Sequence, residues 1–429
     1  MISKLATIHH DFKKILESLS IISERLGFKI YLVGGVVRDL LLAKEIIDLD
    51  LVVEGDAIKL ASEFARVAHK ELRRHHAFGT ATVYYGAHKI DFATARKETY
   101  ASQAVLPRVT PAALRDDLLR RDFTINAMAI SLNREDYGLR IDFYGGQHDL
   151  KKGLIRVLHA NSFRDDPTRI IRAVRFMNRF GFRIEPRTRV LAARARQEHA
   201  LALVHPHRLR DEIVLLLKEP DPWKCLVSIE KMYGLSFIAN VRLTQESRKL
   251  FGRIRQALGV YQKNFSQHRP LDIWLLYLSA VLMRPSVRAV DMFFSTFDFR
   301  RGERVRVLSI KKYITKVKIL ARPVTTHRIY RLLNPLSFEA IVFLYSFHTN
   351  ARLRANIRYF LNSLAHVRLK VRGEDLKRIG IKPHTAYGGL LEKLLDVVLD
   401  QGLATKEEEI RALCVLARRR GLVAPAAHK

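Results

Sequence analysis

Two patterns of hydrophobic and polar positions share the first 150 residues. A helical spacing of apolar side chains comes first, at Phe12, Ile15, Leu16, Leu19 and Ile22. The short apolar run at 30–33 then ends at two glycines, which predicts a strand and a tight turn. Comparable patterns predict helices over 36–42 and 57–67 and strands over 49–53, 80–85 and 89–93. This part of the chain is therefore predicted to be a small mixed α and β domain.

The strand patterns fade from about Ser162, and amphipathic helical patterns continue almost to the end of the chain. The rest of the molecule is accordingly predicted to be all-α, which makes the fold class α+β. The most apolar stretch, at 273–283, is well short of the roughly 20 residues that span a bilayer, so it predicts a buried helix.

The composition is that of a folded protein with an unusual charge. Hydrophobic residues make up 48% and charged residues 28% of the 429, which excludes a disordered chain. The formal net charge of +32 favours a polyanionic partner, first nucleic acid and second an anionic membrane. Because no segment is long enough to span a bilayer, we expect no membrane partner.

Most of the positive charge lies in one part of the helical region. Residues 241–370 hold 25 Lys and Arg against 6 Asp and Glu, a net +19. Their cations interleave with aromatic residues such as Tyr313, Tyr359 and Phe360, as expected for a surface that follows phosphates. The basic residues concerned are Arg301, Arg304, Arg306, Lys311, Lys312, Lys316, Lys318, Arg352, Arg354 and Arg358. The alternative is a set of merely solvated helix faces.

The N-terminus carries neither an apolar signal core nor a small-residue cleavage site, so we expect a cytoplasmic protein. Only two cysteines occur, Cys225 and Cys414, far apart in the sequence. This argues against a disulfide framework or a thiolate zinc site, and we expect both cysteines to be buried.

Gly34 and Gly35 follow the first predicted strand and open a helix. A turn of this kind brings backbone N–H groups together and, without Cβ atoms, lets a phosphate approach closely. Arg38 adds a charged fork one turn later. An ordinary turn is the alternative for this segment taken alone.

Asp48 and Asp50 flank Leu49 at the start of the second predicted strand, so both carboxylates point to one face. A divalent cation relieves their repulsion, and a site that combines carboxylates with phosphate oxygens is typical of Mg²⁺. Asp91 supplies a third acid if its strand lies alongside. The alternative is a solvated pair at a strand end. Together with the glycine turn, the acids suggest nucleotidyl transfer, in which metal ions activate a hydroxyl and hold a triphosphate.

Further along the chain, Asp166 and Arg169 are three residues apart, which on a helix places them on one face. They offer an acceptor and a forked donor, which cytosine and adenine can both satisfy. Uracil and guanine would set a carbonyl against the carboxylate, at a cost of about 1 to 3 kcal/mol for each unpaired group. The alternative is an ordinary salt bridge on a helix surface.

These motifs, in this order, resemble those of class II tRNA nucleotidyltransferases (CCA-adding enzymes) and their bacterial poly(A) polymerase relatives. Residues 32–39 resemble the phosphate turn of the family, and Asp48 with Asp50 its metal pair. Residues 120–129 resemble the ribose-recognition motif, and 165–169 the base-reading motif, which usually begins with Glu instead of Asp165. The resemblance is dense over 31–217, diffuse over 223–366, and returns at 373–383.

The resemblance implies a fold and a set of roles. The fold is a small mixed-sheet nucleotidyltransferase head, similar to that of DNA polymerase β, followed by an elongated all-α neck, body and tail. The predicted boundaries are 1–155, 156–222, 223–365 and 366–429. The implied catalytic residues are Asp48, Asp50 and Asp91, with Mg²⁺ held by Asp48 and Asp50. The implied nucleotide-binding residues are Gly34, Gly35, Arg38, Arg121, Asp122, Asn126, Asp165, Asp166 and Arg169.

Two parts of the resemblance are open to another interpretation. In the first interpretation, Arg121 and Asp122 bind the triphosphate and the ribose of the nucleotide. In the second interpretation, they form a structural ion pair. His75 and His76 match the family but are interpreted as structural, because no second set of ligands stands at metal spacing. Residues 96–111 are a candidate for the mobile element that bears on the change from C to A addition.

The activity implied by the resemblance is addition of CCA to the 3′ end of tRNA from CTP and ATP, without a nucleic-acid template. The basic helical region is expected to bind the acceptor and TΨC arms of tRNA by shape and phosphate. No protein partner and no added phosphohydrolase domain are predicted. The alternatives are an A-adding or CC-adding enzyme of a split pathway, a poly(A) polymerase, and a catalytically inactive RNA-binding protein.

Overall fold

The computed structural model describes residues 10–239, 241–265, 268–381, 387–420 and 422. The chain divides into two compact units, Met1–Phe237 and Ile238–Lys429. Lys382 and Pro383, at the end of the motif predicted for the tail, lie outside the described residues. The finer division into head, neck, body and tail stays a prediction.

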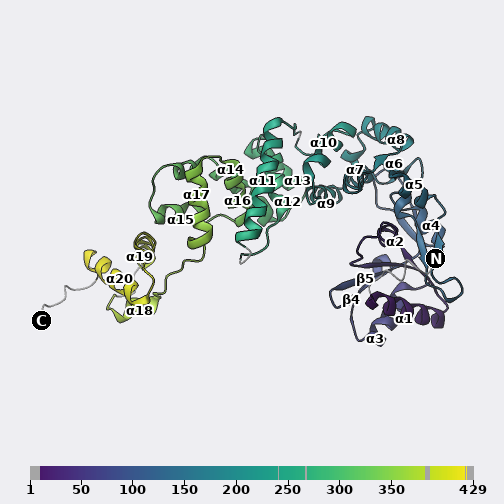
Figure 1. Cartoon of the computed structure of the whole chain (residues 1–429), viewed down its shortest axis with the longest axis horizontal. Coiled ribbons are helices and arrows are strands. Elements are labelled where there is room, and N and C mark those ends of the chain that lie inside the picture. The colour runs from purple at the N-terminus through teal and green to yellow at the C-terminus, as the bar shows by residue number, and fades with distance from the viewer. Residues whose placement is uncertain (1–9, 240, 266–267, 382–386, 421, 423–429) are drawn as a thin grey trace. The chain divides into compact units, whose positions relative to one another are not determined.

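A seven-stranded mixed sheet lies in the first unit, as the sequence patterns predicted (Figure 1). The strand order is β3-β4-β5-β2-β1-β8-β9. Only β2 and β5 pair in parallel, and the other neighbours are antiparallel. The strands are β1 Lys29–Val33, β2 Leu49–Glu54, β3 Glu71–His75, β4 Thr80–Tyr85, β5 His88–Thr94, β8 Ala129–Ser131 and β9 Arg140–Ile141.

Two short strand pairs lie outside this sheet. β6 (Arg96–Thr99) and β7 (Arg108–Pro111) form an antiparallel hairpin, and β10 (Leu154–Ile155) pairs in parallel with β11 (Arg183–Ile184). The last strand corrects the prediction that everything after Ser162 is helical. Gly181 ends a helix with φ +70° and Pro186 begins the next, so the residues between them are extended.

Strand alternation separates a packed face from a polar one. Leu51 and Phe92 are direct neighbours on β2 and β5, and Phe92 contacts Phe64 of helix α3 (Ala57–Ala68) with ring centroids 6.2 Å apart. Asp50 and Asp91, one residue earlier on the same strands, therefore point to the opposite face. That face carries the site described below.

The helices of the first unit cover the sheet and continue beyond it. Those near the sheet are α1 His10–Leu26, α2 Gly35–Leu41, α3 Ala57–Ala68, α4 Leu114–Leu119 and α5 Gly146–Lys152. Those that follow are α6 Ser162–Asp165, α7 Arg169–Phe180, α8 Pro186–Gln197, α9 Pro206–Leu217 and α10 Pro222–Met232.

The secondary structure of the second unit consists of helices, with no strand among its described residues. Its α-helices are α11 Gln245–Asn264, α12 Ile273–Val281, α13 Val287–Thr296, α14 Arg301–Tyr313, α15 Thr326–Leu333, α16 Phe338–Phe347, α17 Ala351–Tyr359, α18 Gly373–Arg378, α19 Tyr387–Gln401 and α20 Lys406–Arg419. The helix predicted over 273–283 is confirmed as α12, which is buried from Trp274 to Val281. The last three helices share a hydrophobic cluster of their own around Leu376, Leu394 and Leu413.

The structure shows how apolar the helices are and how far the two cysteines are buried. Among the described helices, none is both long and apolar enough to cross a membrane. Cys225 is buried as predicted, whereas the prediction for Cys414 is wrong. Cys414 lies on α20 between the buried Leu413 and the partly exposed Val415, so its side chain is only partly covered.

Candidate active site

The glycine turn connects β1 to α2. Gly34 has φ +73° and ψ −132°, a backbone conformation that L side chains rarely adopt. Its N–H donates to the carbonyl of Met128 at 3.2 Å, so this group is already engaged. A Cβ built on Gly34 would lie 2.6 Å from Nη1 of Arg121. Glycine at this position therefore lets the guanidinium of Arg121 lie against the turn.

Arg38 lies one turn into α2 and is held by the protein. Its Nε and Nη2 donate to the carboxylate of Asp39 at 2.9 and 2.8 Å, and its Nη1 donates to Oδ1 of Asn126 at 2.6 Å. The guanidinium also stacks on Phe180, with 4.7 Å between Cζ and the ring centroid. Arg38 thus forms part of the wall of the site, and its contact with a phosphate stays a prediction.

The acidic side chains meet where β2 and β5 run in parallel. Asp50 and Asp91 are direct partners in the strand pairing, so the predicted closeness of the third acid is confirmed. Asp91 accepts hydrogen bonds from the hydroxyl of Thr82 at 2.5 Å and from the ammonium of Lys89 at 2.9 Å. Asp48 precedes β2 and accepts the backbone N–H of Lys89 at 2.9 Å.

The acidic group fits an oxygen-binding cation. Desolvation by the surrounding protein atoms raises the pKa of the Asp50 carboxyl. The positive charge of Arg121 opposes this increase, whereas the negative charges of Asp91 and Asp48 add to it. Carboxylate oxygens are the ligands that Mg²⁺ prefers. Among the described residues, no group of three or more His, Cys, Asp or Glu side chains could hold a metal ion by itself. Oxygens from water or from a bound ligand would therefore complete the coordination.

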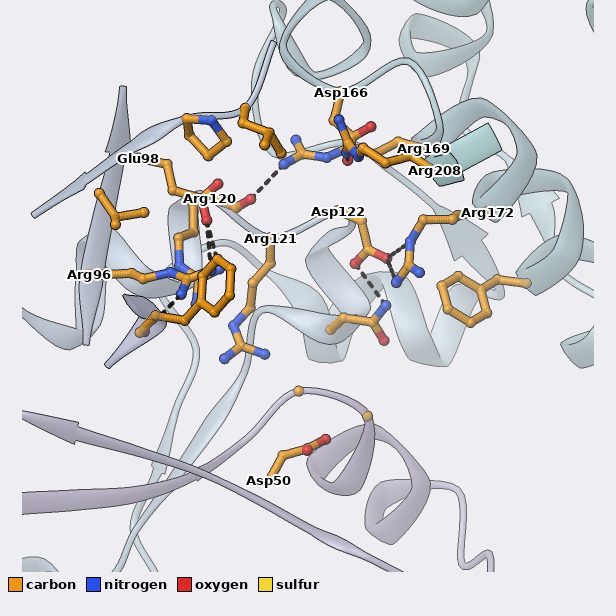
Figure 2. A pocket seen from close by; sticks show the side chains of 18 of the residues that line it. Asp50, Arg96, Glu98, Arg120, Arg121, Asp122, Asp166, Arg169, Arg172 and Arg208 are labelled. Carbon is orange, nitrogen blue, oxygen red and sulfur yellow. Dashed lines mark hydrogen bonds and ion pairs between the residues drawn. The ribbon is translucent and has the colours of Figure 1, made fainter. Parts of the chain in front are cut away.

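A buried carboxylate in α4 positions two arginines. Asp117 is completely buried and accepts from Nε and Nη2 of Arg120 at 2.9 and 2.6 Å and from Nη2 of Arg121 at 3.0 Å. The spacing of three and four residues places all three side chains on one side of the chain turn. In Figure 2 the side chain of Arg121 extends toward Asp50 across the site.

The charge of Asp117 should make stability depend on pH. Burial raises the pKa of this carboxyl, but Arg121 and Arg120 outweigh burial and lower the pKa below its ordinary value of 3.8. A lowered pKa contributes stability above the pKa of the unfolded state and loses it as pH falls through the folded pKa. We expect the destabilisation caused by Asp117→Asn to be largest near neutral pH and to shrink below about pH 4. Urea denaturation of both proteins across this range measures it, and a constant difference would contradict it.

Asp122 and Asn126 connect the turn to the helices beyond. Oδ1 of Asp122 accepts from Nδ2 of Asn126 at 2.9 Å, and Oδ2 accepts from Nη2 of Arg172 at 2.7 Å. Nη1 of Arg172 also donates a hydrogen bond to Oε1 of Glu212 in α9, at 3.2 Å. A chain of polar contacts thus runs from Arg38 to α9. The contacts predicted for Asp122 and Asn126 with a nucleotide stay predictions, since both side chains already have protein partners.

The prediction that the base-reading motif lies on one helix is wrong. α6 ends at Asp165, α7 begins at Arg169, and Asp166 between them is extended, with φ −139° and ψ 92°. Pro167 disfavours the helical conformation in the residue that precedes it. Oδ1 of Asp166 accepts the N–H and the hydroxyl of Thr168 at 3.1 and 2.6 Å, which stabilises the break.

The two base-reading side chains have different partners. Asp166 forms an ion pair with Arg208 of α9, with 2.7 Å between Oδ2 and Nη2. Arg169 donates from Nη1 to the hydroxyl of Ser162 at 2.7 Å and from Nη2 to the carbonyl of Arg120 at 2.6 Å. The acceptor and the donor expected on one helix face are therefore supported from separate segments.

These segments enclose a cavity of about 790 Å³ (Figure 2). The predicted site residues that line it are Gly34, Gly35, Arg38, Asp50, Arg121, Asp122, Asn126, Asp166 and Arg169. A second cavity of about 340 Å³ shares Asp50 and Arg121 with the first and is lined by Asp91. Asp48 and Asp165 line neither, and Asp165 lies 3.9 Å from Nε2 of His159.

The large cavity is strongly basic. The arginines that line it are Arg38, Arg96, Arg120, Arg121, Arg169, Arg172, Arg175, Arg179 and Arg208. Three of them carry a buried N–H group without a partner among the described residues: Nε of Arg96, Nε of Arg121 and Nη1 of Arg208. Because a buried donor without an acceptor is costly, the cavity is suited to an anionic ligand rich in acceptors.

Two carboxylates at this site, Glu98 and Asp117, received no individual role from the sequence. Glu98 accepts from Arg96 at 3.2 Å, from Arg120 at 3.1 Å and from the phenol of Tyr100 at 2.7 Å, which ties the β6–β7 hairpin to the arginines. The position of Asp117, three and four residues before two arginines, was a usable signal for its role. The contacts of Glu98 span up to 22 residues and had no such signal.

Comparisons with known proteins agree with this geometry. The model of the Poly A polymerase head domain matches residues 30–156. An A-adding tRNA nucleotidyltransferase of Halalkalibacterium halodurans is 31% identical over 386 residues, which cover 89% of this chain and 87% of that protein. This chain belongs to the tRNA nucleotidyltransferase family. A second family member, the A-adding tRNA nucleotidyltransferase of Aquifex aeolicus, is 36% identical over 82% of this chain, but the chain spans only 43% of its length.

Solved structures of the tRNA nucleotidyltransferase family share the fold. The Thermotoga maritima CCA-adding enzyme complexed with tRNA is 30% identical, with a TM-score of 0.72 and coverage of 96% of this chain and 97% of that one. A CCA-adding enzyme in complex with ATP has a TM-score of 0.76 at 30% identity, with coverage of 96% and 97%. The resemblance drawn from the motifs, and the mixed-sheet head followed by helices, are therefore confirmed.

Proposed function

We propose that this family member adds CCA to the 3′ end of tRNA, taking CTP and ATP as substrates and releasing pyrophosphate without a template. One observation carries the proposal. A single cavity is lined by an acid of the predicted metal pair, by the glycine turn, and by an acceptor and donors suited to a base edge. The unpaired N–H groups of its arginines support a triphosphate as the ligand.

The residues of the site have separate tasks in this reaction. Asp48 and Asp50 would hold Mg²⁺, which when bound makes the attacking hydroxyl more acidic and balances the triphosphate charge. Arg121, held by Asp117, would bind the triphosphate beside Gly34. Asp91 would complete the acidic surface next to the acceptor hydroxyl.

The basic side chains of the second unit support tRNA as the acceptor. Arg304 is paired with Asp291, and Arg306 with Asp272 and Glu339, so these two contribute to the fold. The predicted phosphate-binding residues that remain exposed are Arg301, Lys312, Lys316, Lys318, Arg352 and Arg358. Exposed cations of this kind suit the backbone of an A-form RNA.

The reaction can be tested with two acceptors, a tRNA that ends at the discriminator base and a tRNA that ends in CC. Each is incubated with CTP, with ATP and with both, and the products are resolved at single-nucleotide length. We expect complete CCA on the first acceptor when both nucleotides are present, and A alone on the second with ATP. Long oligo(A) products would instead indicate a poly(A) polymerase, and no product from a protein that still binds tRNA would indicate an inactive RNA-binding protein.

Addition of only the terminal A is a second candidate, because the relatives from Halalkalibacterium halodurans and Aquifex aeolicus are A-adding enzymes. The same experiment separates the two activities. Extension of the CC-ended acceptor with no extension of the discriminator-ended one would favour this candidate and overturn the first.

A further inference from the structure

Lys89 lies near the start of β5, next to the predicted metal pair. Its ammonium donates to Oδ2 of Asp91 at 2.9 Å, and its backbone N–H donates to Oδ1 of Asp48, also at 2.9 Å. The hydroxyl of Thr82 donates to the other oxygen of Asp91 at 2.5 Å. Both oxygens of the third predicted acid therefore already accept hydrogen bonds from the protein.

Two cations lie near the three predicted acids, and they are held in different ways. Arg121 and Lys89 both place positive charge near the carboxylate of Asp50. Arg121 forms its ion pair with Asp117 of α4, outside the acidic group. Lys89 instead forms its ion pair with Asp91, at 2.9 Å, inside the acidic group. The ammonium of Lys89 is therefore placed where a bound metal ion would meet the same carboxylates.

We propose that Lys89 is an internal counter-ion of the acidic group, whose ammonium competes with a divalent cation and weakens cation binding to the nucleotide-free enzyme. This inference rests on the metal site of the proposed function. An ammonium beside the carboxylates repels an incoming cation, and the repulsion is twice as strong for a divalent ion as for a monovalent one. The oxygens of a triphosphate add ligands and negative charge, so the cation and the nucleotide bind more tightly together than apart.

The alternative is that Lys89 only orients the carboxylate of Asp91. The side chains of Lys89 and Asp91 are 45% and 38% exposed, so their ion pair should contribute little to the stability of the fold. Thr82 still holds Asp91 when the ammonium is removed. An orienting role predicts unchanged or weaker cation binding without the ammonium, whereas a counter-ion predicts tighter binding. The sign of the change in affinity therefore separates the two roles.

The experiment titrates the nucleotide-free protein with Mn²⁺, detected by electron paramagnetic resonance, for the wild type, Lys89→Met, Lys89→Arg and Asp50→Asn. We expect Lys89→Met to bind Mn²⁺ about threefold to tenfold more tightly than the wild type, the size expected from one unit charge near a divalent ion in a partly solvated site. Lys89→Arg keeps the positive charge and should keep an affinity close to that of the wild type. Lys59→Met is the matched control, because Lys59 is an exposed residue of α3, which packs on the opposite face of the sheet, and its affinity should be unchanged.

An affinity of Lys89→Met equal to or weaker than that of the wild type would overturn the inference. Asp50→Asn locates the bound ion, because removal of this acid should weaken Mn²⁺ binding at the site. If Asp50→Asn bound Mn²⁺ as tightly as the wild type, the metal site of the proposed function would fail together with this inference. Far-ultraviolet circular dichroism and thermal melting identify a variant that has lost its fold, in which case Lys89→Gln replaces Lys89→Met. Because neither nucleotide nor tRNA is present, a failure of CCA addition would leave these affinities measurable and would be recognised separately.

Discussion

Asp50→Asn is expected to lower nucleotide incorporation by at least about a thousandfold, while the affinity for tRNA stays within about twofold of the wild type. Asp50 is the member of the predicted metal pair that lines both cavities, and it is the direct strand partner of Asp91. The amide keeps the shape of the carboxylate but removes its charge, so a divalent cation loses a ligand. The exposed cations of the second unit are unaffected, which is why tRNA binding should persist.

Single-turnover incorporation at saturating nucleotide and Mg²⁺ measures the loss, and a gel-shift or polarisation titration measures the affinity for tRNA. Asp116→Asn is the matched control, because Asp116 is a partly exposed residue of α4 outside the lining of either cavity, and it should retain full activity. Asp48→Ala should also abolish incorporation, as expected for the other half of the pair. Incorporation by Asp50→Asn at a rate near that of the control would exclude this acid from the chemistry.

The sequence left open whether Asp91 lies beside Asp50, because the pairing of β2 with β5 joins strands that are distant in the sequence. Local patterns were sufficient to place Asp50 itself, because alternation along β2 puts it on the face opposite Leu51. The glycine turn could likewise be predicted, since a strand followed by two glycines and a short helix is typical of a tight turn. These features depend on neighbours within a few residues, which a single sequence contains.

Features that depend on distant contacts could not be predicted. The contact of Arg38 with Asn126, which is 88 residues away, and that of Asp122 with Arg172, 50 residues away, had no local signal. The break between α6 and α7 is a different case, because Pro167 stands in the motif and its effect on Asp166 is local. The spacing of Asp166 and Arg169 fits one face of a helix, but Pro167 prevents the helical conformation at Asp166.

Glu219→Ala is expected to cost about 3 to 5 kcal/mol of unfolding free energy, the loss typical of removing one partner from a buried ion pair. The side chain of Glu219 is only 1% exposed and accepts from Nε of Arg175 at 3.1 Å and from Arg179 at 2.6 and 2.9 Å. Arg175 is itself 6% exposed, so the substitution would leave a desolvated cation with Glu212 as its remaining partner. Urea denaturation followed by circular dichroism measures the loss.

Glu198→Ala removes the same side chain from an exposed pair and provides the comparison. Its partner Arg194 is 66% exposed and lies four residues away on the same helix, so the expected loss is at most about 0.5 kcal/mol. Replacing Arg175 by Met in the Glu219→Ala protein should recover part of the stability, because the buried cation is then removed as well. Equal free energies of unfolding for Glu219→Ala and Glu198→Ala would contradict the prediction. The ion pairs of Glu219 with Arg175 and Arg179 would then be solvated in solution, and burial would not make them stronger than the exposed pair.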